Sequence, residues 1–451
     1  MRCKIFICLL IMACWANVHA QDTKDCYITP ERFGCVGDSI TDDADNMQKA
    51  IDYCKAHNRI LRSSKGKIYA ISHPLDITTP HEMQIDFGGA EIKAIKSMDY
   101  MMKYDNHLDF NIRHNNVLNN IVFECNDMSG GIFCATAIKT SFNFIMIRNC
   151  SGKAFDYEDG YEVIFTNSHI HCNEGENTYG LYLKSGDSHF DNVVIIDAHT
   201  AIYQKIPSVN FFDKIHAWMY HHVAGTAFLH LAGGMAIVQE GYCDTFEKGY
   251  YIDSPSSFLR LMGGQYYNNP ECYDSAVRPI IFAYDSQEQA KRKSVTCTNC
   301  HFSAGMKCDF CNYPVHRIQL LQCLFVPDVL GNRGELPLTA IKGITLNRSL
   351  VNIADNTNVL NSDIDNINHL YVDANVESYE KDKNVLDVAI LPKAFFPTKQ
   401  VYGICVIVWN DGTCSNGCVE VNENNGIIHV TSGDKKWKKT VKRVVIDMNY
   451  N

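Results

Sequence analysis

The sequence lacks the glycine-rich phosphate-binding motifs of nucleotide-dependent enzymes. Neither the GxxxxGK[ST] phosphate loop nor the GxGxxG dinucleotide pattern occurs in its 451 residues. It also lacks an excess of basic residues, because 41 Lys and Arg stand against 51 Asp and Glu and the formal net charge is −10. Phosphate contacts require a clustered basic surface, so nucleotide chemistry and general nucleic-acid binding are both disfavoured.

The apolar stretch near the N-terminus is too short to span a bilayer. Ile5–Trp15 follows two basic residues and falls well below the ~20 residues of a spanning helix. Val18-His19-Ala20 then forms a small-x-small cleavage pattern. We therefore expect residues 1–20 to be a signal peptide, removed between Ala20 and Gln21, and the mature chain to be secreted, periplasmic or extracellular, with no retained membrane span. A lipoprotein box at Leu10–Cys14 is the weaker alternative.

Twenty cysteines would permit disulfides in an exported protein, but an odd number remains once three leave with the signal peptide. Several share a local context, as in Asn149-Cys150, Asn299-Cys300 and Gln322-Cys323. Because Cys behaves as a small apolar core residue, this recurrence favours a repeated buried position. The pairs Cys297-x-x-Cys300 and Cys308-x-x-Cys311 resemble a zinc knuckle. Disulfides and core packing stay open there beside the weaker metal interpretation.

Residues 60–350 alternate short runs rich in Ile, Val, Phe and Tyr with polar turn residues, at intervals of roughly 19 to 28 residues typical of repeat proteins. Clear examples are Phe144–Asn149, Val163–His171 and Asn192–Asp197. Such a period predicts a solenoid, in which each repeat buries its apolar side only by stacking on its neighbours. Two or three short strands per repeat, without a helix, favour a parallel β-helix.

The sequence patterns at the two ends of the chain differ from that of the repeats. One helix is expected at 44–56, where apolar residues recur at spacings of three and four, with Thr41 or Asp42 as its cap. Residues 351–384 are rich in Asn and Asp and indicate a linker or ragged last coils. Strands around Asn-Gly turns predict a small antiparallel β module at 385–451, for capping, homo-oligomerisation or carbohydrate binding.

The segment before the helix carries a family resemblance. Phe33-Gly-Cys-Val-Gly-Asp-Ser-Ile-Thr-Asp-Asp resembles the F-G-A-x-G-D-G-x-T-D-D motif of the pectate-lyase-like superfamily of right-handed parallel β-helix proteins, with Ser39 in place of a glycine. The resemblance covers about residues 30–350. It implies an all-β chain whose residues 21–350 form a right-handed parallel β-helix, with the helix over its N-terminal end. It implies no single activity, because the superfamily includes lyases, glycoside hydrolases, phage depolymerases and non-catalytic proteins.

Polar residues are densest between Asp187 and Tyr242. Aligning the apolar runs of successive repeats predicts one inward row: Ile170, Ile195, Ile215 and Ile237. Side chains alternate along a strand, so the flanking positions face outward. One outward row would be His169, Val194 and His216, and the next would be His171, Ile196, Trp218 and Glu240. A slip of one residue would invert either row.

A ladder of His, Trp and Glu predicts a sugar-binding groove in which Trp218 offers a flat apolar face. A hydrolase needs two carboxyl groups, and the available ones are Asp187, Asp191, Asp213 and Glu240. A lyase needs a base and a cation beside the uronate carboxylate, and the candidate bases are His216, His221 and Tyr242. The acids are not spaced to hold calcium, and the negative net charge slightly favours hydrolysis or a neutral polymer.

We therefore predict a secreted carbohydrate-active enzyme, a glycoside hydrolase or polysaccharide lyase, that cleaves a polysaccharide in a groove across the coils. No cofactor is expected, apart from calcium if the enzyme is a lyase. The predicted catalytic residues are His216, Glu240, Asp213, Tyr242 and His221. The predicted substrate-binding residues are Trp218, His171, Asp187 and Asp191. The alternative is a non-catalytic β-helix protein that binds or displays glycan at a surface.

Overall fold

The structure is a computed structural model. The chain consists of two compact units, Met1–Asn173 and Glu174–Asn451. The structure describes residues 27–79, 82–106, 116–220, 223–268, 278–283, 295–304, 318–321, 323–326, 344–353, 357–362, 369–375, 385–390, 401–422, 424, 427–432 and 441–449. The predicted signal peptide lies outside these residues. In the described part, no helix is long and apolar enough to cross a membrane.

The first unit consists of short parallel strands and one α-helix. Its elements are β1 (Tyr27–Ile28), η1 (Pro30–Phe33), β2 (Asp38–Asp42), α2 (Ala44–His57), β3 (Ile60–Arg62), β4 (Ile68–Ile71), β5 (Leu75–Thr78), β6 (Gln84–Asp86), β7 (Glu91–Ala94), β8 (Tyr100–Asp105), β9 (Asn116–Glu124), β10 (Gly130–Ile138), β11 (Thr140–Cys150), β12 (Lys153–Tyr157), β13 (Gly160–Tyr161) and β14 (Ile164–Cys172). Each strand pairs with a strand one coil away, as β11 does with β9 and β14.

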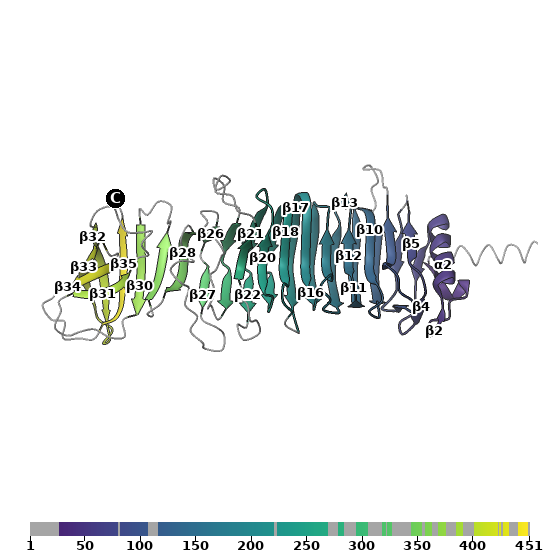
Figure 1. The fold of residues 1–451 in the computed structure, drawn as a ribbon, viewed down its shortest axis with the longest axis horizontal. Coiled ribbons are helices and arrows are strands. Elements are labelled where there is room, and N and C mark those ends of the chain that lie inside the picture. The colour runs from purple at the N-terminus through teal and green to yellow at the C-terminus, as the bar shows by residue number, and fades with distance from the viewer. Residues whose placement is uncertain are drawn as a thin grey trace, which may run out of the picture. The chain divides into compact units, whose positions relative to one another are not determined.

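The second unit begins with parallel coils and ends in an antiparallel sheet. Its elements are β15 (Tyr179–Leu183), β16 (Ser188–Ile196), β17 (Thr200–Trp218), β18 (Ala227–Gln239), β19 (Tyr242–Asp244), β20 (Lys248–Ile252), β21 (Phe258–Met262), β22 (Gln265–Asn268), β23 (Arg278–Phe282), β24 (Val295–Thr298), β25 (His301–Ala304), β26 (Ile318–Leu321), β27 (Leu324–Val326), β28 (Ile344–Ile353), β29 (Thr357–Ser362), β30 (His369–Asn375), β31 (Val385–Ile390), β32 (Val401–Trp409), β33 (Cys414–Val421), β34 (Ile427–Ser432) and β35 (Val441–Asn449). Within this unit, Figure 1 shows β17, β18 and β20 as neighbouring arrows.

This architecture is a right-handed parallel β-helix, which confirms the predicted fold class. Alternation along each strand sends one set of side chains inward, where they meet the same position of the next coil. Phe190 and Phe212, for example, stack with ring centroids 5.3 Å apart, and both are buried. Such rows of stacked apolar side chains form the core of each unit, because no repeat can bury its apolar side alone.

Within each unit, left-handed backbone marks one corner of the coils. The corner residues of the first unit are Asn120, Phe144 and Asn167, and those of the second are Asn192, Lys214, Glu240, Gly263 and Asn299. All have φ between 50° and 68°. Asn and Gly tolerate this conformation better than other residues, and they fill five of these eight positions; Phe144, Lys214 and Glu240 are strained there. We call this set the corner row.

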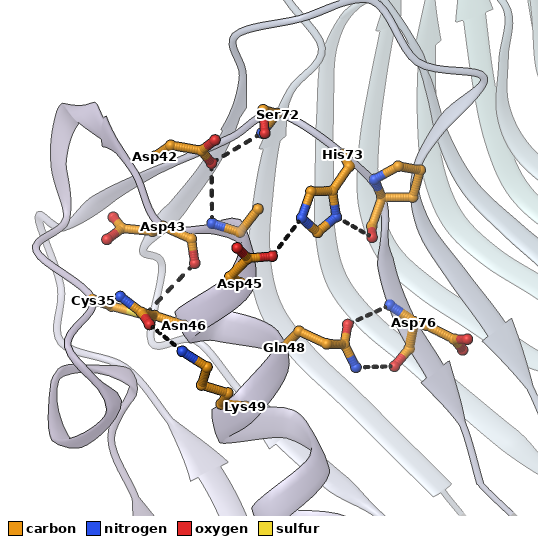
Figure 2. Close-up of polar contacts among 12 residues, drawn as sticks. Cys35, Asp42, Asp43, Asp45, Asn46, Gln48, Lys49, Ser72, His73 and Asp76 are labelled. Atoms are coloured by element: carbon orange, nitrogen blue, oxygen red, sulfur yellow. Dashed lines mark hydrogen bonds and ion pairs between the residues drawn. The ribbon is translucent and has the colours of Figure 1, made fainter.

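Helix α2 covers the N-terminal strands of the first unit, as predicted, and extends one residue beyond the predicted end. Its apolar stripe, which includes Met47, Ile51 and Cys54, is buried. The Gln48 amide accepts the Asp76 N–H at 2.8 Å and donates to the Asp76 carbonyl at 2.9 Å (Figure 2). Gln48 therefore satisfies backbone groups of β5 in the way a neighbouring strand would.

Asp43 explains the shape of the N-terminal motif. Its side chain is fully buried, and its carboxylate accepts the N–H groups of Val36 at 2.7 Å and Gly37 at 2.9 Å. Asp43 is also the N-cap residue of α2, whereas the sequence favoured Thr41 or Asp42. Asp42 still contributes, because its carboxylate accepts the first helical N–H of Ala44 at 3.2 Å (Figure 2). Ser39 adopts φ 70° at the position where the family motif has glycine.

The antiparallel sheet begins at β28. Its first residues, 344–347, pair in parallel with β26, and residues 347–353 pair antiparallel with β29. β29 and β30, which pair with each other, lie in the stretch 351–384 that the sequence assigned to a linker or last coils. β30 then pairs with β35, so this stretch joins the C-terminal sheet. The small antiparallel module is confirmed, with β32 spanning the predicted Val401–Trp409.

Every cysteine that the structure describes is a free thiol, and all of them except Cys414 and Cys418 are buried. The Cys150 thiol hydrogen-bonds to Cys125 and Cys172 of the same unit. Cys300 makes the same kind of contact with its neighbours Cys297 and Cys323. The predicted stacked core cysteines are therefore present. Cys308 and Cys311 lie outside the described residues, so the proposed knuckle is seen only in half.

Candidate active site

Strands β16, β17, β18 and β19 form the face predicted to hold the site. Parallel pairing places the following residues opposite one another: Asp191 and Asp213, Val194 and His216, Ile196 and Trp218. On the following coil the partners are Gln239 for Asp213, Tyr242 for His216 and Asp244 for Trp218. The face therefore carries three rows of polar and aromatic side chains across the coils.

One predicted neighbour in these rows is wrong. The pairs Val194–His216 and Ile196–Trp218 are as predicted, but Trp218 lies opposite Asp244 rather than Glu240. The reason is coil length, since the coil from Trp218 to Asp244 is four residues longer than the one before it. Glu240 instead follows Gln239 at the corner, in the corner-row position next to Lys214.

The predicted inward row is also corrected. Ile215 lies opposite Val193, and Ile195 lies opposite Ala217, so two inward rows replace the single predicted one. All four of these side chains are buried. Ile237 pairs with Phe211 on a partly exposed position and does not belong to either row.

Three of the predicted acids gather around one lysine. Lys214 Nζ lies 3.1 Å from Asp213 Oδ2 and 3.9 Å from Asp191 Oδ1. The pKa of Lys214 is raised, first by its hydrogen bond to Asp213 and then by the charges of Asp213, Asp191 and Glu240. We call these four residues the Lys214 cluster. Three carboxylates against one ammonium leave the cluster with a negative charge.

The two aspartates of the Lys214 cluster are both accessible and incompletely bonded. Side-chain exposure is 44% for Asp191 and 35% for Asp213. Their Oδ1 atoms are buried and have no hydrogen-bond partner within the described part of the chain. Neighbouring parallel strands lie about 4.8 Å apart, so the backbones of Asp191 and Asp213 are about that far from each other. Buried carboxylate oxygens without partners are uncommon and require an explanation.

Beyond the corner, His216 stacks on Tyr242 with ring centroids 4.7 Å apart and planes 14° apart. Burial lowers the pKa of His216, and the charge of Asp244 opposes that shift. Burial, followed by the charge of Asp244, raises the pKa of Tyr242 to about 12. Both rings are therefore neutral at pH 7. Among the described residues, His216 Nε2 is buried without a hydrogen-bond partner.

Trp218 gives this face its largest aromatic surface. It is partly exposed, and its ring meets that of Tyr220 edge to face at 5.7 Å. Tyr220 is 64% exposed. Two adjacent rings with polar edges are suited to the apolar face of a sugar ring.

Three more residues were predicted to belong to the site. Asp187 is exposed at a different corner, before β16, and four strand residues place it about 13 Å from Asp191. His171 belongs to β14 of the first unit. His221 lies outside the described residues. In the described part of the chain, no group of three or more His, Cys, Asp or Glu residues could hold a metal ion.

Sequence reasoning missed a second row of aromatic side chains in the same unit. Tyr182, Tyr203, His230 and Tyr251 occupy the same position on β15, β17, β18 and β20. We call this set the tyrosine row. Its signal in the sequence is a recurring small residue followed by Leu or Ile and then Tyr, as in Gly180-Leu181-Tyr182 and Ala201-Ile202-Tyr203.

No protein-family model matches the chain. In sequence, 57 residues, or 13% of the chain, are 44% identical to a capsule K30/K69-specific depolymerase of Klebsiella phage K64-1. That match spans 7% of the length of the depolymerase.

Solved structures resemble the chain over a greater length. ORF18 of Geobacillus virus E2 has a TM-score of 0.53 and 14% identity over 96% of this chain and 81% of its own. Endo-xylogalacturonan hydrolase from Aspergillus tubingensis has a TM-score of 0.44 and 11% identity over 72% of this chain and 99% of its own. At such identities the likeness to the viral protein shows the β-helix fold alone.

Proposed function

We propose that the protein is a polysaccharide depolymerase that hydrolyses a glycosidic bond at the Lys214 cluster. A β-helix offers a lateral face suited to an extended polymer. The partial match to a phage capsule depolymerase supports a polymeric glycan as the substrate. A non-catalytic glycan binder would not need paired carboxylates, and their presence beside aromatic side chains favours an enzyme.

The observation that carries this proposal is the placement of Asp191 opposite Asp213 on consecutive coils. Glycosidases that retain anomeric configuration use two carboxyl groups about 5–5.5 Å apart, whereas inverting enzymes need about 6.5–9.5 Å. The spacing of adjacent parallel strands, about 4.8 Å, matches the retaining arrangement. Both side chains are also partly exposed, 44% for Asp191 and 35% for Asp213, so a substrate can approach the two carboxyl groups.

The Lys214 cluster suggests a role for each carboxyl group. Lys214 lies nearer to Asp213, so its ammonium offsets the charge that a nucleophile must carry. Asp213 would attack the anomeric carbon while Asp191 donates its proton to the departing oxygen. The resulting ester on Asp213 would then be displaced by a water molecule, whose proton returns to Asp191. Trp218, five residues further along β17, would hold a sugar ring more distant in the polymer.

Elimination is the second candidate, because His216 and Tyr242 lie together on the adjacent part of the face. Hydrolysis is favoured over it because His216 Nε2 is buried and cannot reach a substrate proton in this arrangement. Tyr242, with a pKa of about 12, is also protonated at neutral pH and would be a poor base.

The test is a glycan panel read for both new reducing ends and the ultraviolet absorbance of unsaturated products. The wild type is compared with Asp191→Asn and Asp213→Asn, each of which removes one carboxylate with little change in volume. Asp52→Asn, at an exposed position of α2, is the matched control. We expect reducing ends without unsaturated product, and a loss of roughly 100-fold or more in either cluster variant, as for other acid–base residues. Unchanged activity in both would remove the Lys214 cluster as the site.

We further propose that the protein acts outside the cytoplasm, after cleavage of residues 1–20. The support is the sequence pattern alone, a basic start, a short apolar stretch and a small-x-small site. Mass spectrometry of the exported chain should give an N-terminus at Gln21. An intact Met1, or a lipid on Cys14, would contradict this.

A further inference from the structure

The tyrosine row is a second surface of the same unit, separate from the Lys214 cluster. Tyr182 lies opposite Tyr203, Tyr203 opposite His230, and His230 opposite Tyr251. The strands that carry the last three, β17, β18 and β20, are neighbours in Figure 1. The residues that follow the row, Leu183, Gln204, Leu231 and Ile252, are buried. Alternation along the strand therefore turns the rings outward, where they are partly exposed.

Contacts between the rings hold the row in place. Tyr182 and Tyr203 stack with centroids 4.6 Å apart and planes 11° apart. His230 stands nearly perpendicular to Tyr203 at 5.0 Å and to Tyr251 at 4.8 Å. Asp253 accepts from His230 Nε2 at 2.9 Å, which fixes the orientation of the imidazole. The surface is thus preorganised, and little side-chain entropy would be lost on binding.

The spacing of the row suits an extended sugar chain. Successive coils are about 4.8 Å apart, which is close to the length that one pyranose adds to an extended polysaccharide. Tyrosine offers an apolar ring face together with a hydroxyl group. Burial raises the pKa of Tyr203 and of Tyr251, so both hydroxyls remain protonated donors at neutral pH.

Three lysines give this surface a local positive charge. Lys184 Nζ lies 5.5 Å from the centre of the Tyr182 ring, and Lys248 Nζ lies 5.0 Å from that of Tyr251. Lys205 is exposed two residues after Tyr203, on the same side of β17. Asp253, two residues after Tyr251, is paired with His230. The cations therefore mark both ends and the middle of the row, although the whole chain is acidic.

We propose that the tyrosine row binds an extended acidic polysaccharide, with the rings under successive sugars and the lysines paired with its carboxylates. This proposal rests on the proposed function, which makes the ligand a glycan. It adds that the glycan is acidic. It also separates two tasks, since the tyrosine row holds the polymer and the Lys214 cluster cleaves it.

The simpler interpretation is that the rings only stabilise the coils, because aromatic pairs contribute about 0.5–1.5 kcal/mol beyond their buried area. A purely stabilising row would not require cations beside its terminal rings. It would also bind no glycan, so binding and stability can be measured separately.

The experiment measures binding in the full chain carrying Asp213→Asn, which prevents cleavage from obscuring affinity. The probes are three acidic polymers (polygalacturonate, alginate and hyaluronate) and two neutral ones (xyloglucan and dextran). Tyr203→Ala removes the central ring, Tyr203→Phe keeps it, and Lys248→Ala removes one cation. Tyr402→Ala, at a 69% exposed tyrosine of β32 outside the row, is the matched control. Thermal unfolding of each variant reports any loss of stability.

We expect at least one acidic polymer to bind, more weakly at high salt, and neither neutral polymer to bind as tightly. Affinity should fall about tenfold in Tyr203→Ala and several-fold in Lys248→Ala, and should be retained in Tyr203→Phe and Tyr402→Ala. No binding to the acidic polymers, equal binding to the neutral ones, or unchanged affinity in a folded Tyr203→Ala would each overturn the proposal. Cleavage by the wild type is read independently, so the proposed function can fail or stand on its own.

Discussion

The imidazole of His216 lies flat against the phenol ring of Tyr242 on the following coil, 4.7 Å between centroids. Because burial lowers the pKa of His216, this histidine is neutral in the folded protein at pH 7. Burial lowers the pKa of His199 and His301 in the same way. The second unit thus contains three histidines that resist protonation while it is folded.

These histidines predict a loss of stability in mild acid. Their folded pKa values lie below the unfolded value of 6.5, so below that pH the unfolded chain binds more protons than the native state. Their contribution is therefore complete above pH 6.5 and is lost as the pH falls through the lowered values. Urea midpoints measured from pH 8 to pH 5 should decline on the acid side, and His216→Gln should reduce the decline. An NMR titration that places the His216 pKa at or above 6.5 would contradict this.

Replacing Asp43 should destabilise the N-terminal cap. Asp43→Ala leaves the N–H groups of Val36 and Gly37 without their buried acceptor. Charge-assisted hydrogen bonds of this kind are worth about 1.5–3 kcal/mol each, so we expect a loss of about 3 kcal/mol in the free energy of unfolding. Asp45→Ala is the control, because that residue is 87% exposed and its contact with His73 is worth no more than about 1 kcal/mol. Equal effects in the two variants would refute the role given to Asp43.

Replacing Phe144 with Asn should stabilise the protein. It has φ 53°, it is 53% exposed, and its corner-row neighbours are Asn120 and Asn167. Left-handed backbone costs most non-Gly residues about 1–2 kcal/mol, and Asn considerably less. Phe144→Asn should therefore raise the free energy of unfolding by about 0.5–1 kcal/mol. Met146→Asn, which introduces Asn at an exposed strand position of β11, should not raise the free energy of unfolding. Destabilisation by Phe144→Asn would show that its exposed ring contributes more than the strain costs.

The sequence was sufficient for the architecture because the features that determine it are local. The N-terminal motif, the α2 stripe and the alternating strands each depend on residues close together in the chain. The buried cysteines could also be predicted from adjacent residues. Asn149 and Asn299 adopt left-handed φ, and the thiols of the cysteines that follow them are buried.

The site was predicted less well because it depends on register between coils. Asp191, Asp213 and Glu240 do meet, but around Lys214, which sequence reasoning had not considered. The position of Glu240 was misjudged because the coil after Trp218 has four additional residues, which an assumed repeat length does not detect. The tyrosine row was missed because aromatic residues in a strand indicate β structure before they indicate a ligand.

The anomeric configuration of the first product tests the central claim most directly. If Asp191 and Asp213 act as neighbouring carboxyl groups on consecutive coils, the strand spacing of about 4.8 Å predicts that no water fits between them, and hydrolysis should proceed through an ester with retention. Proton NMR recorded early in the cleavage of a susceptible glycan should show the newly formed reducing end in the configuration of the bond that was broken. Inverted product, or an unsaturated sugar at the new non-reducing end, would contradict the assignment of this pair.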